Sequence, residues 1–273
     1  METRVTLLDG GAMEQDGMLM FWMAGPSGPY RFPVYSVLIE HAEGRFLFDS
    51  GVDKALFTRL VAGGTQTDDA NVPGALGIFQ SERQTLPGQL DLLGLAPRDI
   101  TYVMNSHYHL DHVGGNALCC CATTLCHQAE LDAINHPHPI EAFGYSDNRF
   151  LCPQSPIDGR ATDIYTPRFE ALCGDVEVAK GLTLLETPGH TPGHYSLLVR
   201  LARRRPMLFT GDACYSKRNL DIMAIPGPHV DPKQAYGSLE RLKQLADLHD
   251  AELFYSHDRE SWPSYVKAPG SYV

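Results

Sequence analysis

Three histidines and one aspartate lie within six residues of this sequence, at His107, His109, Asp111 and His112. Imidazole nitrogen with a little carboxylate oxygen suits zinc better than magnesium or calcium, which prefer shells made only of oxygen. The motif follows an apolar run at 100–104 that has the length and β-branched character of a buried strand. A loop leaving a strand can turn alternate side chains inward. We therefore expect His107 and His109 to reach one metal ion and Asp111 and His112 to reach a second.

Two metal ions need more ligands than one loop supplies, and three further residues are candidates. His190 lies in a segment stiffened by two Pro-Gly pairs, whereas Asp212 and His257 each follow an apolar, strand-like run. Taken singly, each histidine could be an ordinary loop residue and Asp212 could be a helix N-cap. All three, however, repeat the pattern of the first motif, in which a ligand-type residue follows a strand. The shared pattern favours a dinuclear site, with the Asp212 carboxylate able to bridge the two ions.

Strands and helices alternate along the rest of the chain and would position these residues. Both halves contain several strands followed by helices, which predicts two β-sheets facing each other with helices outside. We see no linker, so residues 1–273 are expected to form a single domain with insertions near 53–93 and 137–169. We expect strands at 5–8, 34–39, 45–51, 100–104, 176–178, 182–186, 196–199, 207–210 and 251–255, and helices at 54–61, 88–93, 125–133 and 232–249.

The charge balance excludes some classes of partner. The chain has 22 Lys and Arg against 33 Asp and Glu, a net charge of -11, which argues against binding to nucleic acid or to an anionic membrane. The N-terminus lacks the basic start and unbroken apolar core of a signal peptide. No apolar run approaches the roughly 18 residues of a membrane span. We therefore expect a cytoplasmic protein.

The cysteines form a poor disulfide framework. There are seven, an odd number, and Cys119, Cys120 and Cys121 are consecutive. Adjacent cysteines can hardly bridge each other without strain. This run and Cys126 could form a thiolate metal site, but the CxxC spacing is missing. We expect buried or half-buried free thiols.

A short apolar segment at 18–26, bounded by Gly and Pro, contains Phe21 and Trp22. It is too short for a helix of normal length, and we expect a loop that packs its aromatic rings into a pocket. Such a loop either lines a substrate site or belongs to the core or to a subunit contact. A homodimer is therefore possible.

The region of Asp49, the motif at 107–112, His190, Asp212 and His257 together resemble the metallo-β-lactamase superfamily over nearly the whole chain. The resemblance implies an αββα four-layer sandwich that binds two Zn²⁺ per chain. It implies that Asp49 supports the metal-binding loop and does not bind metal. His194 has no counterpart among the implied ligands and is expected to be structural. The implied ligands are His107, His109 and His190 for the first zinc, Asp111, His112 and His257 for the second, and Asp212 as the bridge.

Branches of this superfamily differ at positions that this chain shows. The commonest dizinc β-lactamases carry a cysteine in place of Asp212, and the flavodiiron branch carries a glutamate in place of His109. The RNA-processing nucleases fit poorly with the acidic charge. Tyr215, three residues after Asp212, stands where quorum-quenching lactonases carry a tyrosine that touches the substrate. A lactonase is thus favoured, and a glyoxalase II-like thioesterase or a non-catalytic metal-binding protein is the alternative.

Two stretches, 32–49 and 193–199, resemble 4-pyridoxolactonase as well as N-acyl-homoserine lactonases. The resemblance implies a dinuclear zinc lactonase that hydrolyses the ester bond of one of these two lactones by attack of a metal-bridging hydroxide. Tyr215 is expected to stabilise the oxyanion and Asp111 to relay a proton. Phe21, Trp22 and Tyr215 are the expected substrate-binding residues.

Overall fold

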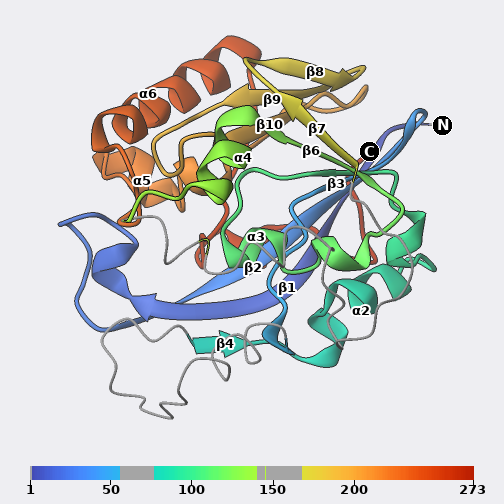
Figure 1. Ribbon diagram of the computed structural model, residues 1–273, viewed down its shortest axis with the longest axis horizontal. Helices are drawn as coiled ribbons and strands as arrows, with labels where there is room; N and C mark the ends of the chain where they lie inside the picture. Colours follow the sequence, from blue (N-terminus) through green and yellow to red (C-terminus); the bar gives the residue numbers. More distant parts are fainter. Residues whose placement is uncertain (1, 56–76, 140–144, 146–167) are drawn as a thin grey trace.

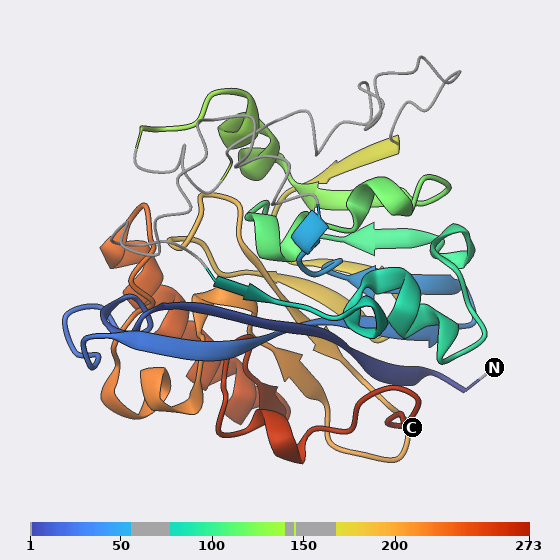
Figure 2. The same ribbon diagram turned by 90° about the horizontal axis from the view of Figure 1, so that it is seen from below.

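Two β-sheets lie face to face in a computed structural model that describes residues 2–55, 77–139, 145 and 168–273. Within these residues, one sheet has seven strands in the order β4-β1-β2-β3-β5-β6-β7, and the other has five in the order β12-β11-β10-β9-β8. Figures 1 and 2 show the longest helix, α6, outside the five-stranded sheet, and α2 on the opposite side of the molecule. This is the expected αββα arrangement.

The described strands and helices have the following bounds. The strands are β1 (Arg4–Asp16), β2 (Pro29–His41), β3 (Gly44–Phe48), β4 (Gly77–Phe79), β5 (Tyr102–Met104), β6 (Thr123–His127), β7 (Arg168–Leu172), β8 (Val176–Ala179), β9 (Leu182–Glu186), β10 (Tyr195–Val199), β11 (Met207–Phe209) and β12 (Glu252–Phe254). The α-helices are α2 (Leu86–Asp91), α3 (Leu110–Val113), α4 (Gln128–Asn135), α5 (Lys217–Ile222) and α6 (Pro232–His249).

The layers follow from the alternation of side chains along each strand. In β1, Leu7 packs in the core between the two sheets, and its neighbour Leu8 packs toward α2. In β10, Leu197 faces the same central core, whereas Leu198 packs against α6. Each sheet thus buries both faces, one against the other sheet and one against helices.

Helix α6 has the bounds that the sequence predicts. Its N-cap, Asp231, accepts hydrogen bonds from the backbone N–H groups of Lys233 at 2.8 Å and Gln234 at 3.0 Å. Leu239, Leu242 and other apolar residues at helical spacing are buried against the five-stranded sheet. A cap and an amphipathic face are both local signals, which explains why this helix could be predicted.

Three expectations about local structure are wrong. Residues 125–127 belong to strand β6 and not to a helix, since β6 pairs with both β5 and β7 and takes its conformation from those neighbours. Strand β1 extends far beyond 5–8, because a shift in its pairing with β2 at 9–12 accommodates two glycines that interrupt the strand pattern. The third expected strand, 45–51, ends at Phe48. Most of the helix expected at 54–61, and residues 56–76, 140–144 and 146–167 of the insertions, lie outside the described residues.

The cysteines are only partly buried. All six cysteines in the described residues are free thiols, but Cys120, Cys121 and Cys173 are exposed, so the expectation of burial is wrong for these three. Residues 120 and 121 form a turn before β6, and of the three consecutive cysteines only Cys119 points into the core. Cys152 lies outside the described residues.

Among the residues that the structure describes, no helix combines the length and the apolar character that a membrane crossing requires.

Candidate metal centre

The ligand-type residues meet because their strands end at a common edge. Strands β9, β11 and β12 run in the same direction, and His190, Asp212 and His257 follow their carboxyl ends. The motif at 107–112 leaves β5 of the other sheet and continues into α3. A hydrogen bond of 2.7 Å from Tyr195 N to Ser106 O joins the two sheets at this edge.

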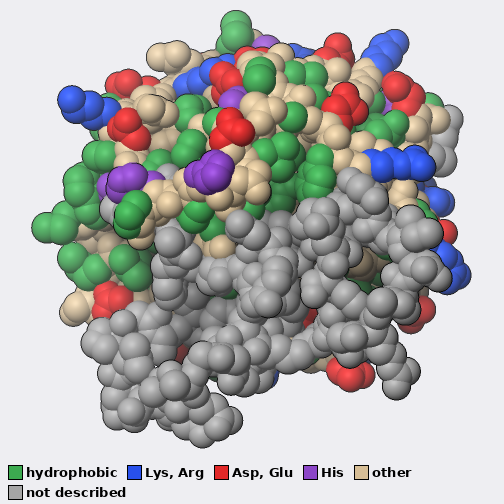
Figure 3. Space-filling model, in the orientation of Figure 1, with side chains coloured by type: hydrophobic (Ala, Val, Ile, Leu, Met, Phe, Trp, Pro, Cys, Tyr) green, Lys and Arg blue, Asp and Glu red, His purple; other side chains and the backbone are tan. Residues whose placement is uncertain are grey.

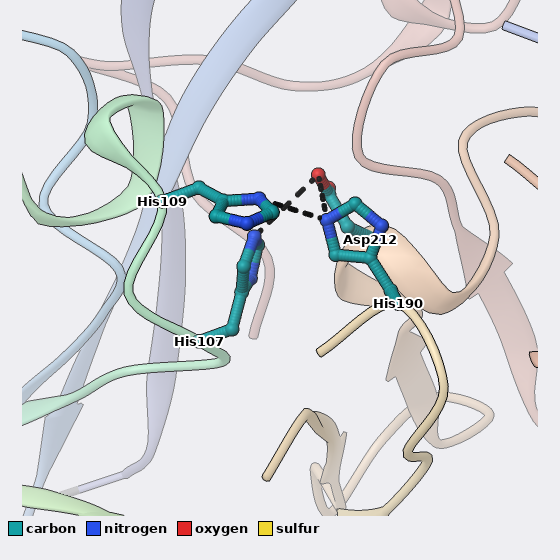
Figure 4. Close-up of side chains that lie close together, drawn as sticks. All are labelled: His107, His109, His190 and Asp212. Atoms are coloured by element: carbon teal, nitrogen blue, oxygen red, sulfur yellow. Dashed lines mark hydrogen bonds and ion pairs between the residues drawn. The ribbon is translucent and has the colours of Figure 1, made fainter. Parts of the chain in front are cut away.

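The structure brings all seven expected ligands together in two groups. Within each group, the ligand-type atoms all lie within 4.8 Å of one another. We call the group of His107, His109, His190 and Asp212 the first cluster, and Figure 4 shows its side chains pointing toward one another. We call the group of Asp111, His112, Asp212 and His257 the second cluster.

Asp212 belongs to both clusters. Its Oδ2 lies 3.8 Å from His107 Nε2 and 3.4 Å from His190 Nε2 on one side, and 3.2 Å from His112 Nε2 on the other. Its Oδ1 lies 3.1 Å from His257 Nε2. The two carboxylate oxygens are therefore placed between two sets of imidazole nitrogens.

The other acidic member of the second cluster, Asp111, completes it from α3. Asp111 Oδ2 lies 3.6 Å from His112 Nε2 and 3.5 Å from His257 Nε2. The second cluster thus offers two imidazole nitrogens and two carboxylates, and the first offers three imidazole nitrogens and one carboxylate.

Contacts outside the clusters fix the orientation of four imidazoles. In each case Nδ1 has a partner, which leaves Nε2 directed inward as a possible metal ligand. His109 differs, because its Nδ1 faces the cluster and lies 3.0 Å from His190 Nε2. The Nδ1 partners are Ser106 Oγ for His107 at 2.9 Å, Asp49 Oδ2 for His112 at 2.8 Å, Pro228 O for His190 at 2.6 Å and Pro33 O for His257 at 2.9 Å.

Some of the inward atoms are buried without a hydrogen bond of good geometry. Within the described residues these include His107 Nε2, His112 Nε2 and Asp212 Oδ1. Buried polar atoms are nearly always well hydrogen-bonded, so polar atoms that converge without such bonds indicate room for a cation. Nitrogen-rich ligand sets with one or two carboxylates match zinc and similar transition metals. The residues present therefore fit a metal centre.

Burial keeps the three histidines of the first cluster neutral. It lowers the pKa of His107 and of His190 well below the ordinary value, and it lowers the pKa of His109 to about 4. Neutral imidazoles have a free lone pair for a metal ion, and no proton competes with the ion at neutral pH.

The second cluster is electrostatically different. Burial acts to lower the pKa values of His112 and His257, but the carboxylates of Asp212 and Asp111 outweigh it and raise both. Conversely, burial acts to raise the pKa of Asp212, and His112 and His257 outweigh it and hold that pKa well below the usual range. Protons balance the carboxylates here, and a metal cation would take their place.

Asp49 and His194 lie just outside the clusters, as the resemblance implies. Besides His112, Asp49 contacts Ser106, whose backbone N donates to Oδ1 at 2.7 Å and whose hydroxyl donates to Oδ2 at 2.8 Å. His194 Nε2 accepts a hydrogen bond of 2.8 Å from the backbone N of Asp212. Burial lowers the pKa of His194 to about 3, so this imidazole stays neutral and can act as an acceptor.

Tyr215 borders both clusters. Its ring centroid lies 4.8 Å from that of His257 and 5.9 Å from that of His190. Burial, followed by the Asp212 and Asp111 carboxylates, raises the pKa of Tyr215 well above the ordinary value. Its hydroxyl is therefore protonated at neutral pH and available as a donor.

The apolar segment at 18–26 lies beside this tyrosine. Phe21 is 1% exposed and packs in one hydrophobic cluster with Tyr215, whereas Trp22 is 47% exposed. The Trp22 ring stands edge-to-face against His229 at 4.7 Å, and Met23 is 77% exposed. Figure 3 shows hydrophobic side chains gathered on the side of the molecule where Figure 1 draws α5 and the loop that joins β1 to β2.

Sequence reasoning missed the residues that hold the ligands from outside. Pro33 and Pro228 act through backbone carbonyl groups, which carry no side-chain signature. Glu130 bonds both ligand loops, as described below, but in the sequence it is an ordinary glutamate of an expected helix.

Comparisons with known proteins agree with this geometry. The sequence matches the model of the metallo-beta-lactamase superfamily over residues 29–257. It is 30% identical to the N-acyl homoserine lactonase AttM of Rhizobium radiobacter, over 100% of this chain and 99% of that protein. It is also 30% identical to an N-acyl homoserine lactonase of a Bacillus species, over 86% of this chain and 87% of that protein. A solved N-acyl homoserine lactone hydrolase, with N-hexanoyl-L-homoserine at its catalytic metal centre, has a TM-score of 0.82 and 26% identity, and the match covers 99% of each chain.

Proposed function

Because this chain belongs to the metallo-beta-lactamase superfamily, we propose that it is a metal-dependent lactonase that hydrolyses the ring ester of an N-acyl homoserine lactone. The observation that carries this proposal is the carboxylate of Asp212, which lies between two sets of inward-facing imidazole nitrogens. The similarity to N-acyl homoserine lactonases over the whole chain supports the same reaction.

We propose two zinc ions per chain, one in each cluster, with Asp212 as a ligand of both. Bound zinc supplies a Lewis acid for the ester carbonyl and a water of lowered pKa as the nucleophile. The chain's contribution is a cage of oriented imidazoles, whose outer nitrogens are bonded to Ser106, Asp49 and backbone carbonyl groups.

Two residues of the chain act on the reacting ester in this proposal. Tyr215 donates a hydrogen bond from its hydroxyl to the carbonyl oxygen as negative charge develops there. Asp111 is partly exposed and relays a proton toward the departing alkoxide. No protein nucleophile is needed, so no covalent intermediate is expected.

The substrate's apolar portion is assigned to the segment at 18–26. Trp22 and Met23 are exposed beside the buried Phe21, which packs with Tyr215. Exposed apolar side chains next to a polar reaction centre suit a lactone that carries an acyl chain. In this proposal Phe21, which packs with Tyr215, supports the segment from inside.

A second candidate substrate is 4-pyridoxolactone, which the stretch at 32–49 favours by resemblance. The edge-to-face pair of Trp22 and His229 also suits a flat heteroaromatic ring. A glutathione thioester is less suitable, because the chain has a net charge of -11 and glutathione is anionic.

The test is proton release by the purified zinc-loaded protein with N-hexanoyl-homoserine lactone, 4-pyridoxolactone and a glutathione thioester, assayed in parallel. We expect rapid hydrolysis of the acyl-homoserine lactone and no turnover of the thioester. A preference for 4-pyridoxolactone would keep the reaction and change the substrate. Turnover of the thioester alone would replace the lactonase by a glyoxalase II-like enzyme, and no hydrolysis of any of the three would favour a non-catalytic metal-binding protein.

A homodimer joined through the exposed apolar segment is the quaternary state that we propose, and a cytoplasmic location stays a prediction from the sequence. Light scattering of the wild type and of Met23→Asp tests the dimer, which the added charge is expected to dissociate. A wild type that is monomeric at micromolar concentration would contradict it.

A further inference from the structure

Glu130 is a buried carboxylate in the first turn of α4, with 0% of the residue exposed. Its Oε1 accepts a hydrogen bond of 2.9 Å from Tyr108 N and one of 2.7 Å from the Tyr145 hydroxyl. Its Oε2 accepts a third, of 3.0 Å, from Gly193 N. Two backbone amides and one phenol thus converge on a single carboxylate.

The two amides belong to the two loops that form the first cluster. Tyr108 lies between His107 and His109, in the loop that leaves the seven-stranded sheet at β5. Gly193 lies three residues after His190, in the turn that leaves the five-stranded sheet at β9. Glu130 therefore joins the backbones of two loops that come from opposite sheets.

Two further contacts tighten this link. A Cβ added at Gly193 would lie only 2.4 Å from Glu130 N, so the His190 loop rests directly on the start of α4. The Tyr145 ring, whose hydroxyl bonds Glu130, lies 5.4 Å from the His109 ring. Glu130 is consequently connected to both sides of the first cluster.

A buried carboxylate is costly unless each oxygen is well paired. Among the described residues, no Lys, Arg or His forms an ion pair with Glu130, and its charge is balanced by backbone dipoles and a hydroxyl. Burial raises the pKa of Glu130. An uncharged residue would fill this space at lower cost, and the hydrogen bonds of this carboxylate indicate that it holds the two loops.

We propose that Glu130 is a positioning residue that sets the distance between the His107–His109 loop and the His190 loop, and thereby the metal affinity of the first cluster. This inference rests on the proposed function, in which the cluster binds a metal ion. Glu130 contacts neither substrate nor metal and acts only through the backbone of the two loops.

Cobalt titration of the apoprotein separates this role from a general effect on stability. In Glu130→Gln one carboxylate oxygen becomes an NH₂ group that faces an N–H donor, so one of the two loops loses its anchor. We expect the Co²⁺ absorption bands of the first cluster to require about 10- to 100-fold more Co²⁺, as for outer contacts of other metal sites. The bands that are lost should match those lost in His190→Ala and not those lost in His257→Ala.

The matched control is Gln89→Ala, which removes another buried polar side chain that links two segments, through Asp9 N and Arg83 O, away from both clusters. It should lower thermal stability and leave the Co²⁺ titration unchanged. A Glu130→Gln protein that behaves like Gln89→Ala would overturn the inference. If Glu130→Gln does not fold, Glu130→Asp is the second test, because it keeps the charge and shortens the side chain. Weaker Co²⁺ binding at the first cluster would support the role of Glu130, and unchanged binding would overturn it. A wild type that binds no Co²⁺ would instead refute the proposed function.

Discussion

Asp49 Oδ2 lies 2.8 Å from His112 Nδ1, and this contact ties the strand end after β3 to the second cluster. The same carboxylate accepts the backbone N–H and the hydroxyl of Ser106, directly before the first ligand of the motif. One side chain thus orients an imidazole and holds the loop that carries the other histidines. Such outer carboxylates make the ligand more basic and fix its tautomer.

Asp49→Asn is expected to weaken metal binding about 10- to 100-fold, mainly at the second cluster, because a neutral amide is a poorer acceptor for His112. Competition with a chromophoric zinc chelator measures this change. Asp9→Asn serves as the control. It alters a carboxylate of β1 that accepts hydrogen bonds from Gly11 and Gln84, and it should bind zinc like the wild type. Equal affinities of the Asp49 variant and the wild type would contradict the assigned role.

His194→Ala should destabilise the apoprotein by about 1–3 kcal/mol, since the buried backbone N of Asp212 loses its acceptor. Glutamine can place a carbonyl oxygen near the same position, so His194→Gln should recover part of the loss. Urea unfolding of the metal-free proteins gives both values. If Ala and Gln are equally destabilised, the cost comes from lost packing and not from this hydrogen bond.

Tyr215→Phe should lower kcat by about 10²- to 10³-fold, the usual effect of removing one donor from a developing oxyanion. The zinc content should stay at the wild-type value, since the hydroxyl is not in the set of proposed ligands. Steady-state kinetics and metal analysis of the same sample check both statements. Unchanged turnover would remove Tyr215 from the mechanism.

Trp22→Ala should raise KM for long-chain acyl-homoserine lactones about tenfold while kcat changes little, because a contact made equally in ground and transition states affects binding alone. Short-chain lactones should be affected less. Tyr236→Ala removes an aromatic ring of similar exposure, 44%, from α6 and should leave both constants unchanged. An equal effect on short and long chains would place the acyl chain elsewhere.

Thiol labelling should distinguish the buried from the exposed cysteines. Burial raises the pKa of Cys119 and of Cys126 to about 12, so few thiolates form at neutral pH, and both thiols are shielded. Iodoacetamide should modify Cys120, Cys121 and Cys173 in the native protein, and Cys119 and Cys126 only after unfolding. Peptide mapping by mass spectrometry identifies the sites, and rapid native labelling of Cys119 would contradict its burial.

Much of the chemistry and some of the fold were determined by the sequence itself. The motif at 107–112 combines ligand types within a few residues, so its preference for zinc depends on local composition and not on the fold. The bounds of α6 follow from the capping residue Asp231 and an amphipathic pattern, both local. The positions of His190, Asp212 and His257 after strands could likewise be read along the chain.

The tertiary structure alone decided how these segments meet. Strand β6 exists because it has partners on both sides, although part of its sequence was expected to be helical. The placement of Asp212 between the two clusters depends on the order of strands in two different sheets. The bonds from Pro33, Pro228 and Glu130 depend on contacts between residues far apart in the chain, and backbone groups are chemically alike at every position. No pattern in the sequence could therefore have distinguished them.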